Sequence, residues 1–187
     1  MWYMKNKPKN LTIMKKTILL SLVAFLTFAT HFKAQAIEDP YPVGTIIAGA
    51  HVGFLPGVGA NISGDFVIVD SWWRGHFTVG GYAGYNHRWY AHREYAWSNF
   101  AVLPRATYGL NITDDFEVHA GMLAGMGYCG YNYLDANNQI HFDHKFIFDI
   151  GGIAGCRYRL VGNLYADAEL NYTRSMNYIN IGVSYVF

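Results

Sequence analysis

Apolar and polar residues alternate strictly along the C-terminal part of the chain. In residues 178–187 one face carries Ile179, Ile181, Val183, Tyr185 and Phe187, and the other carries Asn180, Gly182 and Ser184. A β-strand points successive side chains to opposite faces, so this pattern predicts a strand. Residues 164–173 alternate in the same way, with Asp167 and Glu169 on the polar face. An apolar exterior around a polar interior is typical of a barrel that spans an outer membrane.

The same period of two recurs along residues 44–187 and predicts eight strands. Each is about ten residues long, which is the length that crosses a bilayer when a strand is tilted. The predicted ranges are 45–54, 58–69, 76–86, 99–110, 116–128, 145–159, 164–173 and 178–187. Pro104 lacks a backbone donor and predicts a bulge in the fourth strand. The predicted fold class is all-β, an eight-stranded antiparallel up-and-down transmembrane β-barrel.

The connections between these strands alternate in length and predict an orientation. The longer loops, 87–98 and 129–144, fall at one end of the barrel, and short turns fall at the other. Barrels of this type place long loops outside the cell and short turns in the periplasm. We therefore expect both long loops to be extracellular.

Residues 1–36 have the pattern of a secretory signal peptide. A basic region beginning at Met14 precedes a short apolar run and the small residues Ala34 and Ala36, so we expect export and a mature start at Ile37. Residues 1–13 then precede an alternative start at Met14, residues 37–43 form a periplasmic lead-in, and residues 44–187 form the barrel. A membrane-anchoring helix is the alternative for this segment, although its apolar run is shorter than the ~20 residues that a span needs.

Removal of this segment changes the sign of the net charge. Six of the 14 basic residues and none of the 13 acidic residues lie in residues 1–36, which leaves 8 basic and 13 acidic side chains and a net charge of −5. No basic stripe remains, which argues against nucleic acid as a partner.

Several stretches resemble the bacterial outer-membrane-protein β-barrel domain family, the small OmpA/OmpX-like barrels. They are residues 155–172 (GCRYRLVGNLYADAELNY), 179–187 (INIGVSYVF), 105–110 (RATYGL) and 118–121 (VHAG). The resemblance implies an integral outer-membrane barrel in contact with lipid and lipopolysaccharide. It also implies that the last strand, through Ile181, Val183, Tyr185 and Phe187, is the signal read by the barrel-assembly machinery. It implies no particular activity, because such barrels serve many roles.

The polar faces of the strands predict a charged interior. Its members are Asp65, Arg105, Glu117, His119, Asp149, Arg157, Arg159, Asp167 and Glu169. Counting back from the turn at Gly162 places Arg157 opposite Asp167, with Glu169 as a diagonal neighbour. Buried charges are costly unless paired, and eight strands leave room only for side chains. We therefore expect a salt-bridged plug, with a proton or ion path as the alternative.

Catalytic and metal chemistry have weaker support in the sequence. Ser98, His92 and Glu94 share one predicted outer loop, but no acyl-hydrolase signature accompanies them. His141 and His144 flank Asp143 in the other loop, where His87 or His92 could complete a metal site. Two histidines and an aspartate so close together in a loop are more often solvated. We assign no catalytic, cofactor-binding or metal-binding residue and expect no cofactor.

The two cysteines are predicted to remain free. Strand parity points Cys129 inward at the outer end and Cys156 outward near the other end, roughly 30 Å away along the strands. That separation is far beyond the ~7 Å Cα limit of a disulfide.

The sequence thus favours a non-enzymatic outer-membrane protein whose loops bind an unknown extracellular ligand or support the envelope. A small-solute or ion channel and a lipid-modifying outer-membrane enzyme are the alternatives. A secreted lipocalin-like carrier would need an apolar interior and a polar exterior, which is the reverse of the faces here.

Overall fold

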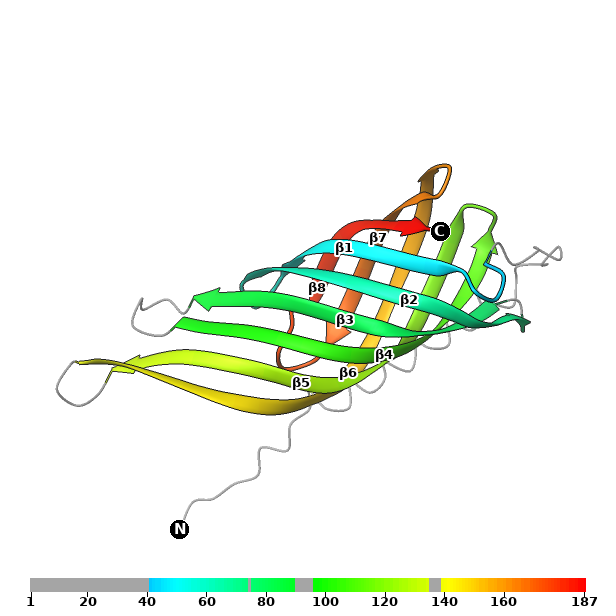
Figure 1. Cartoon of the computed structure of the whole chain (residues 1–187). Helices are drawn as coiled ribbons and strands as arrows, with labels where there is room; N and C mark the ends of the chain where they lie inside the picture. The colour runs from blue at the N-terminus through cyan, green and yellow to red at the C-terminus, as the bar shows by residue number, and fades with distance from the viewer. Residues whose placement is uncertain (1–40, 74, 90–95, 135–138) are drawn as a thin grey trace, which may run out of the picture. The chain divides into compact units, whose positions relative to one another are not determined.

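Eight antiparallel strands close into one barrel (Figure 1). The structure is a computed structural model and describes residues 41–73, 75–89, 96–134 and 139–187. The strands are β1 (Ile46–Phe54), β2 (Val58–Trp72), β3 (Gly75–Trp89), β4 (Ala96–Thr113), β5 (Phe116–Leu134), β6 (Ile140–Val161), β7 (Leu164–Tyr172) and β8 (Ile179–Val186). Each strand pairs with its sequence neighbours, and β1 pairs with β8 to close the ring. The predicted all-β up-and-down barrel is confirmed.

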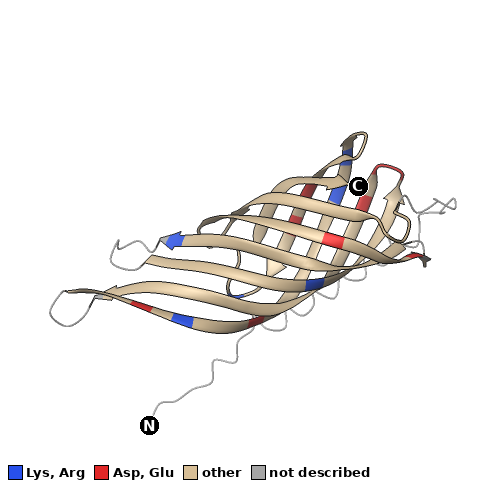
Figure 2. Ribbon diagram, viewed as in Figure 1, with Lys and Arg blue, Asp and Glu red and all other residues tan. Residues whose placement is uncertain are grey.

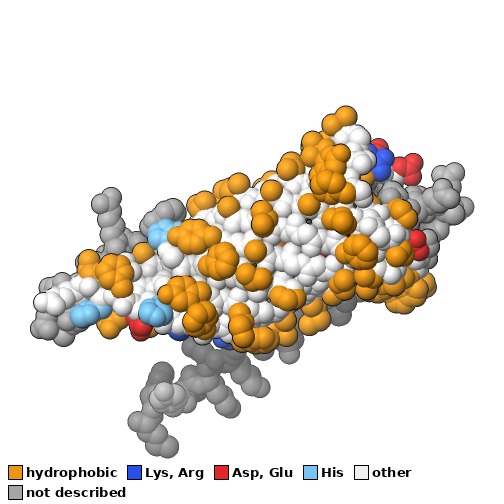
Figure 3. Space-filling view, in the orientation of Figure 1, with side chains coloured by type: hydrophobic (Ala, Val, Ile, Leu, Met, Phe, Trp, Pro, Cys, Tyr) orange, Lys and Arg blue, Asp and Glu red, His pale blue; other side chains and the backbone are white. Residues whose placement is uncertain are grey.

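The burial of side chains alternates along the strands as the sequence pattern requires. On β8, Val183 is 45% exposed on the outer wall, whereas its neighbour Ser184 is 1% exposed in the interior. Ile62 on β2 is 63% exposed, and the polar residue before it, Asn61, is buried. Figure 3 shows hydrophobic side chains spread over the outer wall of the barrel, among white areas of backbone and other side chains. The outside and inside of this protein are therefore reversed relative to a soluble domain.

The strands differ greatly in length, and this corrects both predicted outer loops. Residues 87–89 and 96–98 belong to β3 and β4, and residues 129–134 and 140–144 belong to β5 and β6. The β5–β6 hairpin therefore extends beyond the shorter β7 and β8 (Figure 1). Among the described residues, pairing of β6 with β7 begins only at Gly152 and Tyr172.

The predicted bulge at Pro104 is wrong. Pro104 pairs with Gly81 in an unbroken β3–β4 register. On the β5 side the ladder omits Leu103 and Pro104, but the register is the same before and after them. The missing donor of Pro104 is therefore accommodated by local loss of pairing rather than by an extra residue. The register shifts lie elsewhere, and one falls between Val67 and Val69.

Two small apolar clusters line the interior on either side of its centre. One contains Tyr82, Ala101, Leu103, Leu123, Ile153 and Met176. The other contains Tyr41, Ile47, Val67, Tyr165 and Val186. Along β7 the inward positions run from Tyr165 in the second cluster, through Asp167 and Glu169, to Asn171, which donates a hydrogen bond to Tyr82 in the first (3.1 Å). The acidic residues therefore lie between the two clusters.

One further sequence prediction falls within the described residues, and another falls outside them. Cys129 is buried and Cys156 is partly exposed, and both are free, as predicted. The predicted signal peptide, residues 1–36, lies outside the described residues and stays a prediction. Within the described part of the chain no helix is long and apolar enough to cross a membrane.

Candidate functional site

A belt of ionisable side chains fills the middle of the barrel interior. We call this belt the charged layer, and its members are His51, Asp65, His76, Arg105, Glu117, His119, Arg157, Asp167 and Glu169. Their side chains are at most 2% exposed. Figure 2 shows acidic and basic positions on neighbouring strands of the barrel wall.

Arg105 of β4 joins two of the carboxylates. Its Nε donates to Oδ1 of Asp65 (2.7 Å) and its Nη1 to Oε1 of Glu169 (3.0 Å). A second contact with Asp65 runs from Nη2 to Oδ2. The guanidinium carbon also lies 5.9 Å from the ring centroid of Tyr82. Arg105 thus spans the interior from β2 to β7.

Arg157 of β6 joins the remaining carboxylates. Its Nε donates to Oδ2 of Asp167 and its Nη1 to Oε1 of Glu117, both at 3.0 Å. Its Nη2 lies 3.7 Å from Asp65, which both arginines therefore share. The strand register places Arg157 directly opposite Asp167, as the hairpin count predicted. The principal arginine partner of Glu169, however, is Arg105, because the interior is narrow enough for a side chain to reach across it.

Three histidines adjoin these carboxylates at longer range. Nε2 of His51 lies 3.4 Å from Asp167. Nε2 of His76 lies 3.9 Å from Glu117. His119 lies between Glu117 and Glu169, with a nitrogen 3.5 Å from each. Together with Ser184 of β8, which bonds to Asp167, the layer draws a side chain from every strand.

Two of the nine predicted interior residues lie outside the charged layer. Asp149 is buried, but it accepts hydrogen bonds from the backbone N–H groups of Arg174 (3.1 Å) and Ser175 (2.7 Å). Arg159 is 32% exposed and lies 3.5 Å from Asp115 at the β6–β7 end of the barrel. It also donates to the hydroxyl of Tyr165. The alternation along a strand predicts whether a side chain points inward or outward. Its position along the barrel axis determines which residues it contacts.

The β7–β8 connection has a role that the alternation of apolar and polar residues does not predict. Ser175, Met176 and Asn177 are at most 3% exposed, so the connection folds into the interior instead of projecting outward. Asn86 donates to the carbonyl of Ser175 (2.9 Å), and Asp149 holds the backbone as described. The inward position of Asp149 was the sequence feature that could have indicated this inward fold, because a buried carboxylate needs hydrogen-bond donors.

Tyr41, in the described part of the lead-in before β1, occupies the opposite end of the interior. Tyr41 is 1% exposed. Its ring packs edge-on against His76, with centroids 4.6 Å apart, and lies 6.2 Å from Tyr165. The predicted extended lead-in therefore places an aromatic side chain inside the barrel.

The projecting β5–β6 hairpin, with the start of β4, carries a second group of aromatic and charged residues. We call it the aromatic ladder, and its members are Trp97, Tyr131, Tyr133, His141, Asp143 and Lys145. The Trp97 and Tyr131 centroids are 5.5 Å apart, and Nζ of Lys145 lies 5.6 Å from the Tyr131 ring. Tyr133 stacks on His141 at 5.5 Å.

One hydrogen bond fixes the acidic member of the aromatic ladder. The hydroxyl of Tyr131 donates to Oδ2 of Asp143 (2.7 Å). This bond, helped by the backbone N–H of His144, lowers the pKa of the Asp143 carboxyl from its ordinary value. The same bond raises the pKa of Tyr131. Asp143 is thus held in its ionised form on an exposed surface.

The structure separates the residues considered for a metal site on this hairpin. His141 and Asp143 pair with Tyr133 and Tyr131 on one face of the hairpin. His144 follows Asp143 directly in β6, points to the opposite face and stacks on Tyr128. Because strand neighbours point apart, the three cannot bind one ion together.

The residues considered for catalysis are only partly described. His92 and Glu94 lie outside the described residues. Ser98 is placed beside a different histidine, with its Oγ 2.8 Å from Nδ1 of His87 and 3.2 Å from the hydroxyl of Tyr85. The group lies on the outer face of β3 and β4.

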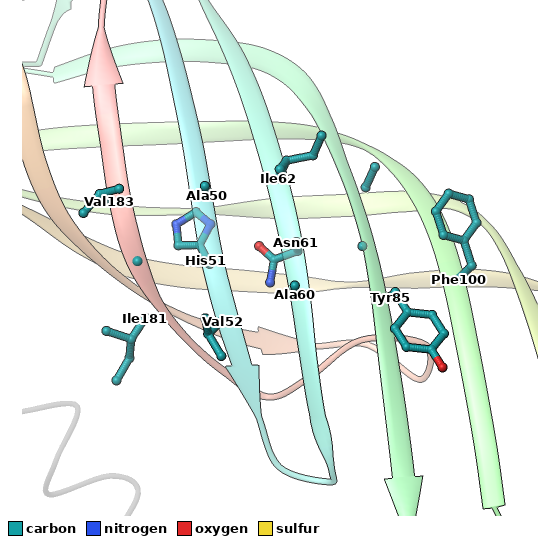
Figure 4. A pocket seen from close by; sticks show the side chains of 13 residues that line it. Ala50, His51, Val52, Ala60, Asn61, Ile62, Tyr85, Phe100, Ile181 and Val183 are labelled. Carbon is teal, nitrogen blue, oxygen red and sulfur yellow. The ribbon is translucent and has the colours of Figure 1, made fainter.

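An apolar depression of about 530 Å³ lies on the outer wall over β1, β2, β3, β4 and β8 (Figure 4). Ala50 and Ala60 are among its small residues, and Ile62 and Val183 are among its larger ones. Its polar neighbour His51 faces the interior instead, where it adjoins Asp167. The depression therefore offers contact area for an apolar chain but no reactive group from the charged layer.

Comparisons with known proteins add no family. No family model and no curated protein match the sequence. Solved structures with a similar arrangement include the N-terminal β-barrel domain of Pseudomonas aeruginosa OprF, with 15% identity, coverage of 77% of this chain and 98% of that chain, and a TM-score of 0.49.

Two further neighbours are equally distant in sequence. Ail, the attachment invasion locus protein of Yersinia pestis, shows 16% identity, coverage of 76% and 95%, and a TM-score of 0.45. Neisserial surface protein A shows 14% identity, coverage of 76% and 92%, and a TM-score of 0.44. The barrel fold therefore rests on the strand pairing of this chain itself.

Proposed function

We propose that this protein is an integral outer-membrane β-barrel, without enzymatic activity, whose projecting hairpin binds a ligand outside the cell. The observation that carries the proposal is the reversal of faces. Large apolar residues such as Met126 (70% exposed) and Phe148 (68% exposed) cover the wall, while Arg157 and Glu169 are buried inside. Such an apolar wall is unfavourable in water, but it is favourable in contact with the hydrocarbon chains of lipid. Outer-membrane lipid and lipopolysaccharide are the expected surroundings.

A closed interior is the second part of the proposal. Tyr41 fills one end, the β7–β8 connection folds into the other, and the charged layer lies between them. An eight-stranded barrel has an interior about as wide as its side chains. We therefore favour a structural wall over a channel.

The aromatic ladder is the surface we assign to ligand binding. It combines aromatic rings, a lysine and an ionised carboxylate on strands that extend past the shorter side of the barrel. Tyrosine and tryptophan are common in binding surfaces because they bury a large area and also offer a polar group. The ligand is an extracellular molecule that this surface can stack against.

The C-terminal strand is assigned to assembly. Ile181, Val183 and Tyr185 lie on the outer wall, and the ring of Phe187 packs against Tyr185 at 4.8 Å. Deletion of Phe187 should lower the amount of protein in the outer membrane, because the barrel-assembly machinery would lose its terminal aromatic contact. Unchanged membrane levels of this truncation would contradict the assignment.

The location and orientation can be tested by labelling whole cells. In a Cys129→Ser, Cys156→Ser background, which removes both free native thiols, Phe142→Cys and Val161→Cys place thiols at similarly exposed sites, 79% and 70%, on opposite ends of β6. A membrane-impermeant maleimide should label Cys at 142 on intact cells and Cys at 161 only after lysis. Labelling of the second site alone would invert the orientation, and recovery of soluble, unlabelled protein would refute the membrane location.

Measurement of ion conductance distinguishes a closed structural barrel from a conducting channel. Planar-bilayer recording of the purified protein should show no steady openings, because side chains fill the interior. Sustained, ion-selective openings would overturn the closed interior and support the porin-like alternative.

A lipid-modifying enzyme is the second candidate, supported by the contact between Ser98 and His87 on the outer face. A serine nucleophile needs a neighbouring base. We expect membranes with and without the protein to have the same lipid acyl composition. Altered lipids that return to normal in Ser98→Ala, but not in Ser63→Ala, would establish this activity instead.

A further inference from the structure

Three side chains of the charged layer converge on one point of its edge. They are His51 of β1 and Asp167 and Glu169 of β7, each with a ligand atom within 4.8 Å of the others. The register places both His51 and Asp167 directly opposite Gly182 of β8. Gly182 has no side chain, so the imidazole and the carboxylate can meet above it.

The carboxylates each have one oxygen in use and one available. Oδ2 of Asp167 accepts from Arg157, and Oε1 of Glu169 accepts from Arg105. Oδ1 of Asp167 and Oε2 of Glu169 are buried without a hydrogen-bond partner among the described residues. Such atoms are costly in a protein interior unless something binds them.

His51 is in the same position. Its side chain is fully buried, and within the described part of the barrel neither ring nitrogen has a partner of good hydrogen-bond geometry. Its Nε2 lies 3.4 Å from Oδ2 of Asp167. That distance is long for a hydrogen bond, so it leaves the ring nitrogens without a close partner among the described residues. Gly49 leaves room for the ring, since a Cβ there would lie 2.7 Å from Cε1 of His51.

The charge of the layer points to the same kind of ligand. Four carboxylates face two arginines, so the arginines leave two negative charges unbalanced. A buried net charge of this size is strongly unfavourable. A single divalent cation would balance it.

We propose that His51, Asp167 and Glu169 bind a divalent transition-metal ion of the zinc class inside the barrel. One imidazole nitrogen and two carboxylate oxygens suit zinc, with water as the remaining ligand. Arg157 and Arg105 hold the second oxygen of each carboxylate and so orient the first. The ion ties β1 to β7 across β8, beside the seam that closes the barrel.

Zinc binding can be measured directly on the purified, folded protein in detergent micelles. Calorimetric titration with Zn²⁺ at about pH 7.5, where an ordinary histidine is neutral, should show one ion per chain. His51→Gln should weaken this binding by at least about tenfold, since even second-shell changes cost ~10–100-fold. The matched control is His76→Gln, which alters a buried histidine of the same layer outside this group and should bind zinc normally.

The wild-type protein provides a readout that does not depend on folding of a variant. X-ray absorption of the zinc-loaded protein should show one imidazole and otherwise oxygen ligands. Two or more imidazoles would place the ion at another site and overturn the proposal, as would equal loss of binding in both variants. Absence of binding, with NMR showing His51 and His119 protonated near neutral pH, would mean that protons balance the charge instead.

Discussion

The charged layer and the aromatic ladder both contain acidic, basic and histidine side chains, but in opposite surroundings. Arg157 in the layer is paired with carboxylates and Lys145 in the ladder lies over aromatic rings, yet Arg157 is 2% exposed and Lys145 lies on the exposed hairpin. In the interior, each carboxylate depends on its arginine because water cannot replace it. On the hairpin, water competes for every contact. Similar chemistry therefore supports stability in one region and accessibility in the other.

The largest test of this contrast is removal of a cation from each region. Arg157→Ala should lower the free energy of unfolding by about 3–5 kcal/mol, because Asp167 and Glu117 lose a buried partner. Lys145→Ala should change it by no more than about 0.5 kcal/mol, as most surface substitutions do. Urea unfolding in lipid vesicles measures both. Equal losses would mean that the layer is hydrated.

Substitution of an outward residue by arginine tests which part of the outer surface contacts lipid. Val183→Arg should cost about 2–4 kcal/mol if the site lies near the bilayer midplane, whereas Phe142→Arg on the projecting hairpin should cost only ~0–1 kcal/mol. The comparison uses two outward apolar residues, 45% and 79% exposed. Refolding equilibria in vesicles would rank them. The reverse ranking would place the hairpin, rather than the barrel, in the lipid.

The smallest expected effect is the loss of stability at acidic pH that comes from protonation of Asp143. The folded protein lowers the pKa of Asp143 from its ordinary value through the hydrogen bond from Tyr131. The stabilisation from this bond is therefore present above the unfolded pKa, about 3.9, and is lost as the pH falls through the lower folded pKa. Carboxyl NMR should give a low midpoint for Asp143 and a higher one in Tyr131→Phe. An identical midpoint in both proteins would show that the hydroxyl does not hold the carboxylate.

The limits of the sequence pattern are visible at particular residues. Alternation placed Asp65 and Arg105 inside and Ile62 and Val183 outside, because the period of a strand is a local property of the backbone. The predicted end of the fifth strand at Tyr128 is wrong, because β5 runs to Leu134; aromatic residues continue a strand as readily as they anchor it at an interface. Cross-strand pairs such as Tyr133 with His141 support the longer hairpin.

The sequence by itself determined the barrel, its inside and outside, the opposition of Arg157 and Asp167, and the separation of the two cysteines. These follow from parity and from counting along one hairpin. Only the tertiary structure decided that Glu169 bonds to Arg105, that the β7–β8 connection fills the interior, and that His51 meets Asp167 above Gly182. These contacts join residues far apart in the chain, and their geometry depends on how the ring closes and how far side chains reach across a narrow interior.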